Sequence, residues 1–369
     1  MDWKDLNRKG ELHAYLISPN NLEIVEEELT GVDWSSLKIT GAYYSDTRTS
    51  GSLRTHNANW NADDAHTPFV RIVYEIPEWN YSRELGTFIV RNDPQEISDG
   101  THRTDLELQS MLYALSLEYP EKKKAIAPGA FASTAMRSEL NDAGLAYVFD
   151  GINEYQVGTL SFLENGQSRL ARMFTLTEMS NNRIDVDGHG TIRLNGYVEP
   201  NAKMATCRID LNDPHGIVKD GIKRTSNYLQ QPSEAVISYK WTEFVNGESV
   251  EHEITAKAEV RAGDHASVGA RGYKITDFEQ VNDLSPKTSE RAWRLANEKL
   301  RKQSATKTEW QIRTTYLPLW EGDVVELFVP YGAKQYQGVR KCLVKNIELT
   351  GELLDMTLTL KETSGGDEE

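Results

Sequence analysis

Cysteine and positive charge are both scarce in this sequence of 369 residues. The 2 cysteines, Cys207 and Cys342, lie far apart, with no CxxC pair and no histidine at ligand spacing. This predicts two reduced, mostly buried thiols and argues against a disulfide scaffold or a metal site. Lysine and arginine total 41 against 56 aspartates and glutamates, a net charge of −15. Because phosphate binding needs clustered positive charge, this argues against nucleic acid as an affinity ligand, although not against nucleic acid that moves past an acidic wall.

Long apolar runs are absent as well. No segment approaches the ~20 consecutive apolar residues of a membrane span. Residues 1–21 (MDWKDLNRKGELHAYLISPNN) carry charges throughout and lack the apolar core of a signal peptide. We therefore expect synthesis in the cytoplasm and no membrane insertion by this chain. The composition, 38% hydrophobic and 26% charged, is that of a folded soluble protein.

The sequence also lacks the signatures of catalysis and of metal or cofactor binding. Its 8 histidines are dispersed, and there is no HExxH, GxSxG, GxGxxG or P-loop motif. The stretch DVDGHG (185–190) begins like a calcium-binding loop, but its twelfth position is Gly196 and not a glutamate, so a hairpin turn is expected. No catalytic, cofactor-binding or metal-binding residue is predicted. Trp60, in the polar stretch 45–68 that we expect to be a long loop, is a candidate for stacking on a sugar.

Strand and helix patterns are present, and they are segregated into blocks. Residues 1–100 are mainly strand patterns, 101–200 combine helices with a hairpin, 201–284 return to strand, and 285–363 combine one helix with several strands. Residues 364–369 are an acidic tail. Segregated blocks predict a multidomain α+β protein and not a doubly wound α/β sheet, with one domain for each block.

Helices are predicted from apolar spacing and capping signals. The stretch TDLELQSMLYALSLEY (104–119) spaces its apolar residues near the helical period and stops at Pro120. A second helix is expected within 129–144, and a third within 159–179. The last helix begins with Ser285 as the N-cap and Pro286 as the first residue, and its apolar stripe consists of Ala292, Leu295, Ala296 and Leu300.

Two hairpins and a distinctive C-terminal segment complete the pattern. The hairpins are predicted over 183–195 and around Asn246-Gly247. In TYLPLWEGDVVELFVPYG (315–332), Gly322-Asp323 is the expected turn between two strands, followed by a loop over 330–338. The candidate core residues of this segment are Leu317, Leu319, Val325 and Leu327.

The order of elements after residue 285 resembles the end of the tail-hub proteins of tailed bacteriophages, a family that includes baseplate hub and tail-associated minor tail proteins. In those proteins a helix leads to a strand, a Gly-Asp turn, a glycine loop and a final strand that alternates threonine and leucine. The positions of this sequence that match are Pro318, Leu319, Gly322, Asp323, Val325, Gly338, Val344, Ile347 and Leu358. The resemblance covers most of the chain and is stronger after residue 160 than before it.

The resemblance implies a structural role in the virion and no enzymatic activity. Tail-hub proteins have β-barrel-like domains with α+β insertions and form a trimeric ring. The ring joins the tail tube or the distal tail protein to a central spike or fibre, near the tape measure protein, and DNA passes through its bore without being retained. The negative charge of this sequence then suggests a net-negative bore, which would not hold DNA in transit.

Two other functions remain open at the level of sequence. One is a receptor- or carbohydrate-binding tail protein that uses the loop containing Trp60. The other is a cell-wall-degrading tail enzyme with a pair of carboxylates, which requires acidic residues with raised pKa values in one cleft.

Overall fold

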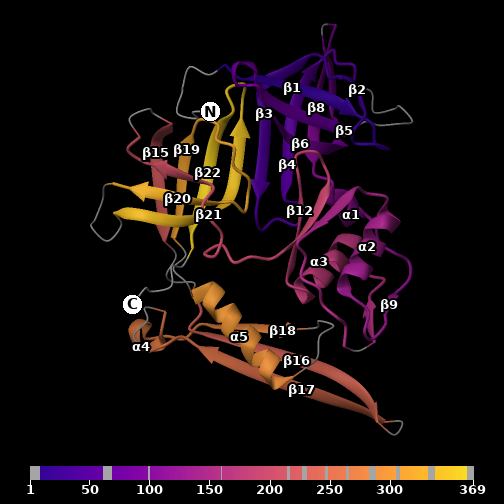
Figure 1. Ribbon diagram of the computed structural model, residues 1–369, viewed down its shortest axis with the longest axis vertical. Coiled ribbons are helices and arrows are strands. Elements are labelled where there is room, and N and C mark those ends of the chain that lie inside the picture. The colour runs from indigo at the N-terminus through magenta and orange to yellow at the C-terminus, as the bar shows by residue number, and fades with distance from the viewer. Residues whose placement is uncertain are drawn as a thin grey trace.

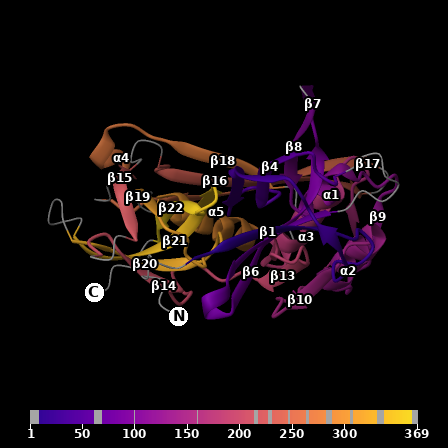
Figure 2. The same ribbon diagram turned by 90° about the horizontal axis from the view of Figure 1, so that it is seen from above.

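One large sheet organises the chain in the computed structural model, which describes residues 9–60, 69–98, 100–158, 160–213, 217–226, 231–245, 248–262, 266–281, 288–304, 308–330 and 337–363. The sheet has 14 strands, in the order β15-β19-β22-β21-β3-β4-β8-β6-β5-β1-β2, with β14, β20 and β7 paired off this path. Figure 1 shows its strands above two smaller units, and Figure 2 shows the N-terminal and C-terminal strands at opposite ends.

The strands of the large sheet come from both ends of the chain. The N-terminal half contains β1 (Glu11–Ile17), β2 (Val25–Glu28), β3 (Val32–Ala42), β4 (Thr49–His56), β5 (Phe69–Ile76), β6 (Tyr81–Asn92), β7 (Gln95–Ser98) and β8 (Thr101–Gln109), with a short 3-10 helix over Pro77–Trp79. The C-terminal half contains β14 (Cys207–Asp210), β15 (Val218–Ser226), β19 (Thr308–Thr314), β20 (Val324–Val329), β21 (Gly338–Thr350) and β22 (Asp355–Glu362).

The two halves meet edge to edge where β21 pairs with β3. The antiparallel register runs from Asn346 opposite Ala42 to Thr350 opposite Lys38. The predicted α+β class is confirmed, but the barrel-like closure of each half is not seen in the described residues. Each half is an open sheet, and β3, the edge strand of the N-terminal half, pairs with β21 of the C-terminal half.

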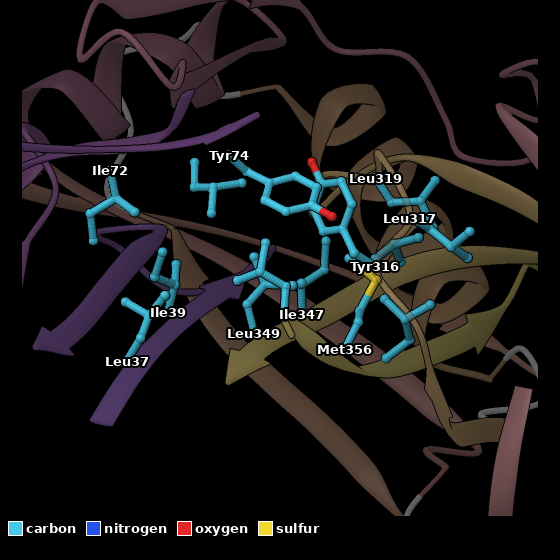
Figure 3. Close-up of a cluster of buried hydrophobic side chains, with 14 of the residues drawn as sticks. Leu37, Ile39, Ile72, Tyr74, Tyr316, Leu317, Leu319, Ile347, Leu349 and Met356 are labelled. Carbon is cyan, nitrogen blue, oxygen red and sulfur yellow. The ribbon is translucent and has the colours of Figure 1, made fainter. Parts of the chain in front are cut away.

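The two halves also share one hydrophobic core. Alternating residues of the strands point to one face, as in β22, where Met356, Leu358 and Leu360 are buried. Around the β21–β3 pairing, side chains of β3 and β21 lie beside those of β5 and of the segment before β20 (Figure 3). The residues labelled there are Leu37, Ile39, Ile72, Tyr74, Tyr316, Leu317, Leu319, Ile347, Leu349 and Met356.

The first departure from the predicted elements is the helix expected over 104–119. Only its second part is helical, as α1 (Leu112–Leu117), whereas residues through Gln109 form strand β8. Leu106 and Leu108 alternate with polar residues and are buried between β4 and β6, so the two-residue period determines the structure there. The boundary predicted at residue 100 falls at the turn of the β7–β8 hairpin, so β8 shares a sheet with the preceding strands.

The polar stretch 45–68 is the second departure. It contains strand β4, which lies in the middle of the sheet between β3 and β8. Ser50, Ser52 and Arg54 alternate with Gly51, Leu53 and Thr55, and Leu53 and Thr55 are buried on the core face. A strand with one polar face therefore resembles a loop in composition.

The unit between β8 and β14 is a first insertion with its own core. It contains α1, β9 (Lys124–Ile126), α2 (Ala132–Ala143), β10 (Tyr147–Asp150), β11 (Ser161–Leu163), α3 (Arg169–Met179), β12 (Asn182–Val186) and β13 (Ile192–Gly196). Gly144 ends α2 in the left-handed conformation, at φ 68°. The predicted hairpin is confirmed as β12–β13, and of the helix expected within 159–179 only α3 forms.

A second insertion separates β15 from its partner β19. It contains β16 (Glu234–Val245), β17 (Glu248–Glu259), α4 (Val268–Arg271), β18 (Thr276–Val281) and α5 (Ser289–Ser304). The register of β16 and β17 confirms the predicted hairpin; its tip, Asn246-Gly247, lies outside the described residues. The predicted stripe of α5 packs on β16 and β17, and not on the C-terminal strands that follow it, so the boundary predicted at 285 divides this unit.

Helix α5 begins directly after Thr288. The backbone N–H of Arg291 donates to the hydroxyl of Thr288 at 3.2 Å, so Thr288 caps the helix. The predicted cap Ser285, its neighbour Pro286 and the acidic tail 364–369 lie outside the described residues, as does most of the loop 330–338. No helix in the described part of the chain is long and apolar enough to cross a membrane.

Candidate functional site

The predicted Gly-Asp turn lies at the point where the two halves of the sheet meet. The strand expected before it ends at Thr314, and residues 315–323 are irregular, so the turn leads into β20 without joining two paired strands. The backbone N–H of Trp320 donates to Oδ2 of Asp323 at 2.7 Å, and the N–H of Asp323 donates to the carbonyl of Trp320 at 3.1 Å. Gly322 has φ +92°, and a Cβ there would lie 2.8 Å from the ring of Tyr43. The turn therefore needs glycine both for its backbone conformation and for close contact with the N-terminal half.

Aromatic side chains fix the apolar side of this turn. The rings of Tyr316 and Tyr74 lie 4.7 Å apart at an angle of 60°, an edge-to-face arrangement that favours packing. The guanidinium of Arg83 lies 4.2 Å from the ring centroid of Trp320 and donates to the carbonyl of Leu319 at 3.2 Å. The segment before β20 is thus held against β5 and β6 of the N-terminal half.

The other side of the turn carries charged groups from three parts of the chain. Arg48, in the turn after β3, is paired with Asp185 of β12 at 3.2 Å and donates to the carbonyl of Ile184. Arg183, also on β12, is paired with Asp185 and lies 3.6 Å above the ring of Tyr43. We call this cluster, with Glu321 and Gly322, the joint. It connects both halves of the sheet to the first insertion.

Glu321 is the most perturbed acid of the joint. Burial, together with the negative charge of Asp185, raises the pKa of Glu321 to about 7. Its Oε1 accepts from the hydroxyl of Thr49 at 3.2 Å. A Cβ at Gly41 of β3 would lie 2.5 Å from Oε2, so the absence of a side chain at Gly41 makes room for the carboxyl group. Glu321 thereby packs directly onto the strand that joins the two halves.

A polar cavity of about 290 Å³ adjoins the joint. Nζ of Lys203 donates to the carbonyl of Gly322 at 3.0 Å, and burial lowers the pKa of this lysine. Burial raises the pKa of Asp323 as well. The residues around the cavity include Tyr43, Arg183, Asp185, Lys203, Glu321 and Asp323. Two basic and three acidic side chains line the cavity, so it carries no strong charge of one sign.

Most of the predicted motif residues meet at this place. Pro318 and Leu319 precede the turn, and Val325 follows it, fully buried between Cys207 and Cys342. The four predicted core residues, Leu317, Leu319, Val325 and Leu327, are all buried. Gly338 lies at the opposite end of β20, opposite Val329, with φ +111° and open space where a Cβ would be. Its role is conformational and lies away from the joint.

The other candidate residues have structural positions. Trp60 is only 7% exposed, and its Nε1 donates to Asp93 at 3.1 Å, so the ring is not available for stacking on a sugar. Both cysteines are free, as predicted, and burial raises the pKa of Cys207 to about 11 and that of Cys342 still further. Among the described residues, no group of three or more potential ligands could hold a metal ion.

Sequence reasoning missed the charged residues of the joint. Arg48 lies in a stretch predicted as loop, Arg183 is an ordinary polar position of a hairpin, and Asp185 was considered only as the first position of a calcium-like loop and assigned to that hairpin. Glu321 is one of many acidic residues and is buried only because Gly41 and Thr49 approach it from the other half. The one available signal was the lack of a side chain at Gly41 within a strand pattern, which indicates a close approach.

Comparison with known proteins identifies the fold. No protein-family model and no curated protein sequence matches the chain. Among solved structures, it is similar to a tail protein of Neisseria meningitidis MC58, with a TM-score of 0.68, 10% identity, and 96% of each chain covered. The chain has the fold of a phage tail protein.

Two further structures share this tail-protein fold. The 43 kDa tail protein of prophage MuSo2 from Shewanella oneidensis matches with a TM-score of 0.64 and 12% identity, over 96% of this chain and 98% of that one. An Escherichia coli component of the type VI secretion system, itself similar to tail proteins of phage T4, matches with a TM-score of 0.51 and 9% identity, over 92% of this chain and 76% of that one. The fold confirms the resemblance seen at the C-terminal third of the sequence.

Proposed function

We propose that the chain is a structural hub of a phage tail tip or baseplate, and that three copies form a ring in the virion. The observation that carries this proposal is the pairing of β21 with β3. It joins two open sheets edge to edge within one chain, which is the contact that a ring of such sheets must repeat between chains. The tail-protein fold supports the same role.

The strands at the two ends of the sheet have edges that could pair with strands of another chain, which supports assembly. The path of paired strands ends at β15 and β2, and β7 pairs only with β8 among the described residues. Unpaired strand edges favour contact with another chain. In the assembled tail, the ring joins the tail tube or distal tail protein to the central spike or fibre, next to the tape measure protein. Double-stranded DNA passes through it and is not retained.

A second candidate function follows from the cavity at the joint. Glu321 and Asp323 both have raised pKa values and both line it. Such a pair is the requirement stated for a cell-wall-degrading enzyme. Both carboxylates also make contacts that hold the turn and the joint, so we propose the structural role for them and a non-enzymatic hub. The buried position of Trp60 argues against the carbohydrate-binding alternative.

The position of the chain in purified tails tests the hub proposal. We expect a reconstruction of the tail tip to contain three copies around the tail axis, in contact with the tube or distal tail protein on one side and the spike or fibre on the other. Absence of the chain from intact tails, or a location only on peripheral fibres, contradicts the proposal. Zymography on host cell walls tests the enzyme: clearing by the wild-type chain that is lost in Glu321→Gln and Asp323→Asn supports catalysis, and no clearing supports the hub.

A further inference from the structure

The hairpin of β12 and β13 contacts the large sheet at both of its ends. Figure 1 shows β12 between the helices of the first insertion and the strands of the large sheet. At the base of the hairpin, Asp185 is paired with Arg48 of the joint. At its tip, the turn over residues 187–190 lies against β5 and β6. Each contact includes one titratable side chain, Glu321 at the base and His189 at the tip.

The tip packs closely on β6 because it carries glycine. A Cβ at Gly188 would lie 2.2 Å from the carbonyl oxygen of Glu84, so a larger residue would prevent this approach. The hydroxyl of Thr87 donates to the carbonyl of Gly188 at 3.0 Å. The buried Arg71 of β5 donates from Nη2 to the carbonyl of His189 at 3.1 Å and from Nε to Thr87 at 2.9 Å. The DVDGHG stretch of the sequence is therefore a turn that docks on the N-terminal half of the sheet.

The ring of His189 lies between two carboxylates. Its Nδ1 is 3.0 Å from Oε1 of Glu84. Its buried Nε2 is 3.2 Å from Oε1 of Glu23, between β1 and β2, an ion-pair contact that is not aligned as a hydrogen bond. A neutral imidazole has one N–H and one lone pair, whereas the protonated ring has two N–H groups. If a neutral ring donates to Glu84, the lone pair of Nε2 faces the second carboxylate, so only the protonated ring is attracted to both.

The charges that face this ring balance only when it is protonated. Nη1 of Arg71 lies 3.7 Å from Oε1 of Glu84, and Asp187 in the same turn is paired with Arg193 of β13 at 2.8 Å. Arg71 therefore offsets one of the two carboxylates around His189, and the protonated ring offsets the other. Loss of the proton leaves one negative charge unbalanced at the tip. Histidine is the side chain whose charge changes between pH 5 and pH 8.

The base of the hairpin responds to pH in the same direction. Burial and the charge of Asp185 raise the pKa of Glu321 to about 7, so this carboxyl group is mostly neutral in mild acid and ionises as the pH rises. Arg48 and Arg183 interact with both acids. An ionised Glu321 repels Asp185 and competes with it for these two guanidinium groups. The contact at the base therefore weakens over the same range of pH as the contact at the tip.

We propose that the β12–β13 hairpin is a pH-sensitive attachment of the first insertion to the large sheet, tight in mildly acidic solution and loosened as the pH rises through the neutral range. Both ends of the hairpin lose attraction on deprotonation, so their effects add. The pairing of β12 with β13 and the separate core of the first insertion contain the structure on the other side. The expected change is therefore a local separation of the hairpin from the sheet and not the unfolding of the insertion.

Hydrogen exchange of backbone amides in the full chain tests the proposal, measured by mass spectrometry on overlapping peptides between pH 5.5 and pH 8. Protection factors are compared, because they remove the intrinsic dependence of exchange on pH. In the wild-type chain we expect the protection of residues 187–191 to fall about 5-fold over this range, a change that partly exposed ion pairs can produce.

The decisive variant is His189→Gln, which replaces the titrating ring with a neutral side chain. Protection of residues 187–191 should then lose most of its pH dependence. The matched control is His13→Gln on β1, where the ring is also about one quarter exposed, with Nδ1 3.1 Å from Glu28 and Nε2 3.9 Å from Glu11. This control should keep the fall seen in the wild type. Thermal unfolding establishes that each variant is folded.

Two further variants separate the ends of the hairpin. Glu321→Gln should reduce the pH dependence of residues 182–186 and leave that of the tip. Glu23→Gln, at a side chain that is 79% exposed, should reduce the fall at the tip without disturbing the core. Protection of the tip that does not change with pH in the wild type, or that falls equally in His189→Gln, overturns the inference. This measurement uses the isolated chain, so its failure is distinct from absence of the chain in purified tails, which would overturn the hub proposal.

Discussion

The two faces of the large sheet are made by alternate residues of the same strands, and their side chains make different kinds of contact. On the core face, Leu349 and Ile347 of β21 pack against side chains from both halves of the chain. On the opposite face, which we call the polar face, Glu348 lies between them in sequence and forms an exposed ion pair with Lys38 at 2.9 Å. The core face therefore holds the two halves together, whereas the side chains of the polar face are exposed to solvent. The joint lies beside the β21–β3 pairing, where the core of the two halves adjoins charged side chains.

The largest effect is expected at Gly322, where the joint closes. In Gly322→Val, a β-branched residue at φ +92° costs about 1–3 kcal/mol in backbone strain. Displacement of the Tyr43 ring, 2.8 Å from the new Cβ, adds about 1–3 kcal/mol. We expect impaired folding and failure of ring assembly, measured by urea unfolding and by incorporation into tails. Gly338→Val is the matched control, because Gly338 also has a positive φ but has open space around the position of a Cβ. This variant should lose only the part of the stability that backbone strain costs. Normal assembly of Gly322→Val contradicts this account.

The second effect concerns the core face at Tyr316. This ring is 2% exposed and packs against Tyr74, so Tyr316→Ala should lower the free energy of unfolding by about 3–5 kcal/mol. Tyr44→Ala removes a tyrosine that is 57% exposed near the polar face and should cost less than about 1 kcal/mol. Chemical denaturation of both variants measures the difference. Similar losses in the two variants would remove the distinction between the faces.

The third effect is a pH dependence at the joint. The pKa of Glu321 is about 7 in the folded chain against 4.5 for the free side chain, so the folded state binds its proton more tightly than the unfolded state. Stability from this group is therefore present below pH 4.5 and is lost as the pH rises to about 7, by at most ~1.4 kcal/mol per pH unit. Glu321→Gln removes this loss, so its stability relative to the wild type should rise between pH 5 and pH 7.

Unfolding free energies of both proteins at several pH values check this expectation. Groups away from residue 321 contribute equally to the two proteins and cancel in the difference. A difference that stays constant with pH means that Glu321 is ionised throughout and is not the buried acid described here.

The smallest effect is expected on the polar face. Glu348→Gln breaks the pair with Lys38, whose two side chains are 40% and 50% exposed, and should change stability by less than about 0.5 kcal/mol. Leu349→Ala, at the next residue of the same strand but on the core face, should cost about 2–5 kcal/mol. Thermal and urea unfolding of both variants measure the loss of unfolding free energy on each face under the same conditions. A large loss in Glu348→Gln would show that the ion pairs are structural.

Several features were accessible from sequence because they depend on local spacing. The period-2 pattern of β22, the glycine that ends α2 and the Gly322-Asp323 turn each reflect the geometry of a few adjacent residues. Helical spacing failed for β8, because Leu106 and Leu108 also fit alternation and the sheet decided between the two. The joint was not predictable, since Arg48, Arg183 and Glu321 come from three distant segments.

The sequence by itself determined the class of elements, the faces of the strands and the residues that turn the chain, because side-chain period and backbone preference act within a few residues. Only the tertiary structure decided that β21 pairs with β3, that two insertions leave one sheet uninterrupted, and that Glu321 is buried. These features depend on which distant strands exclude water from each other, and on which charges are left together when they do.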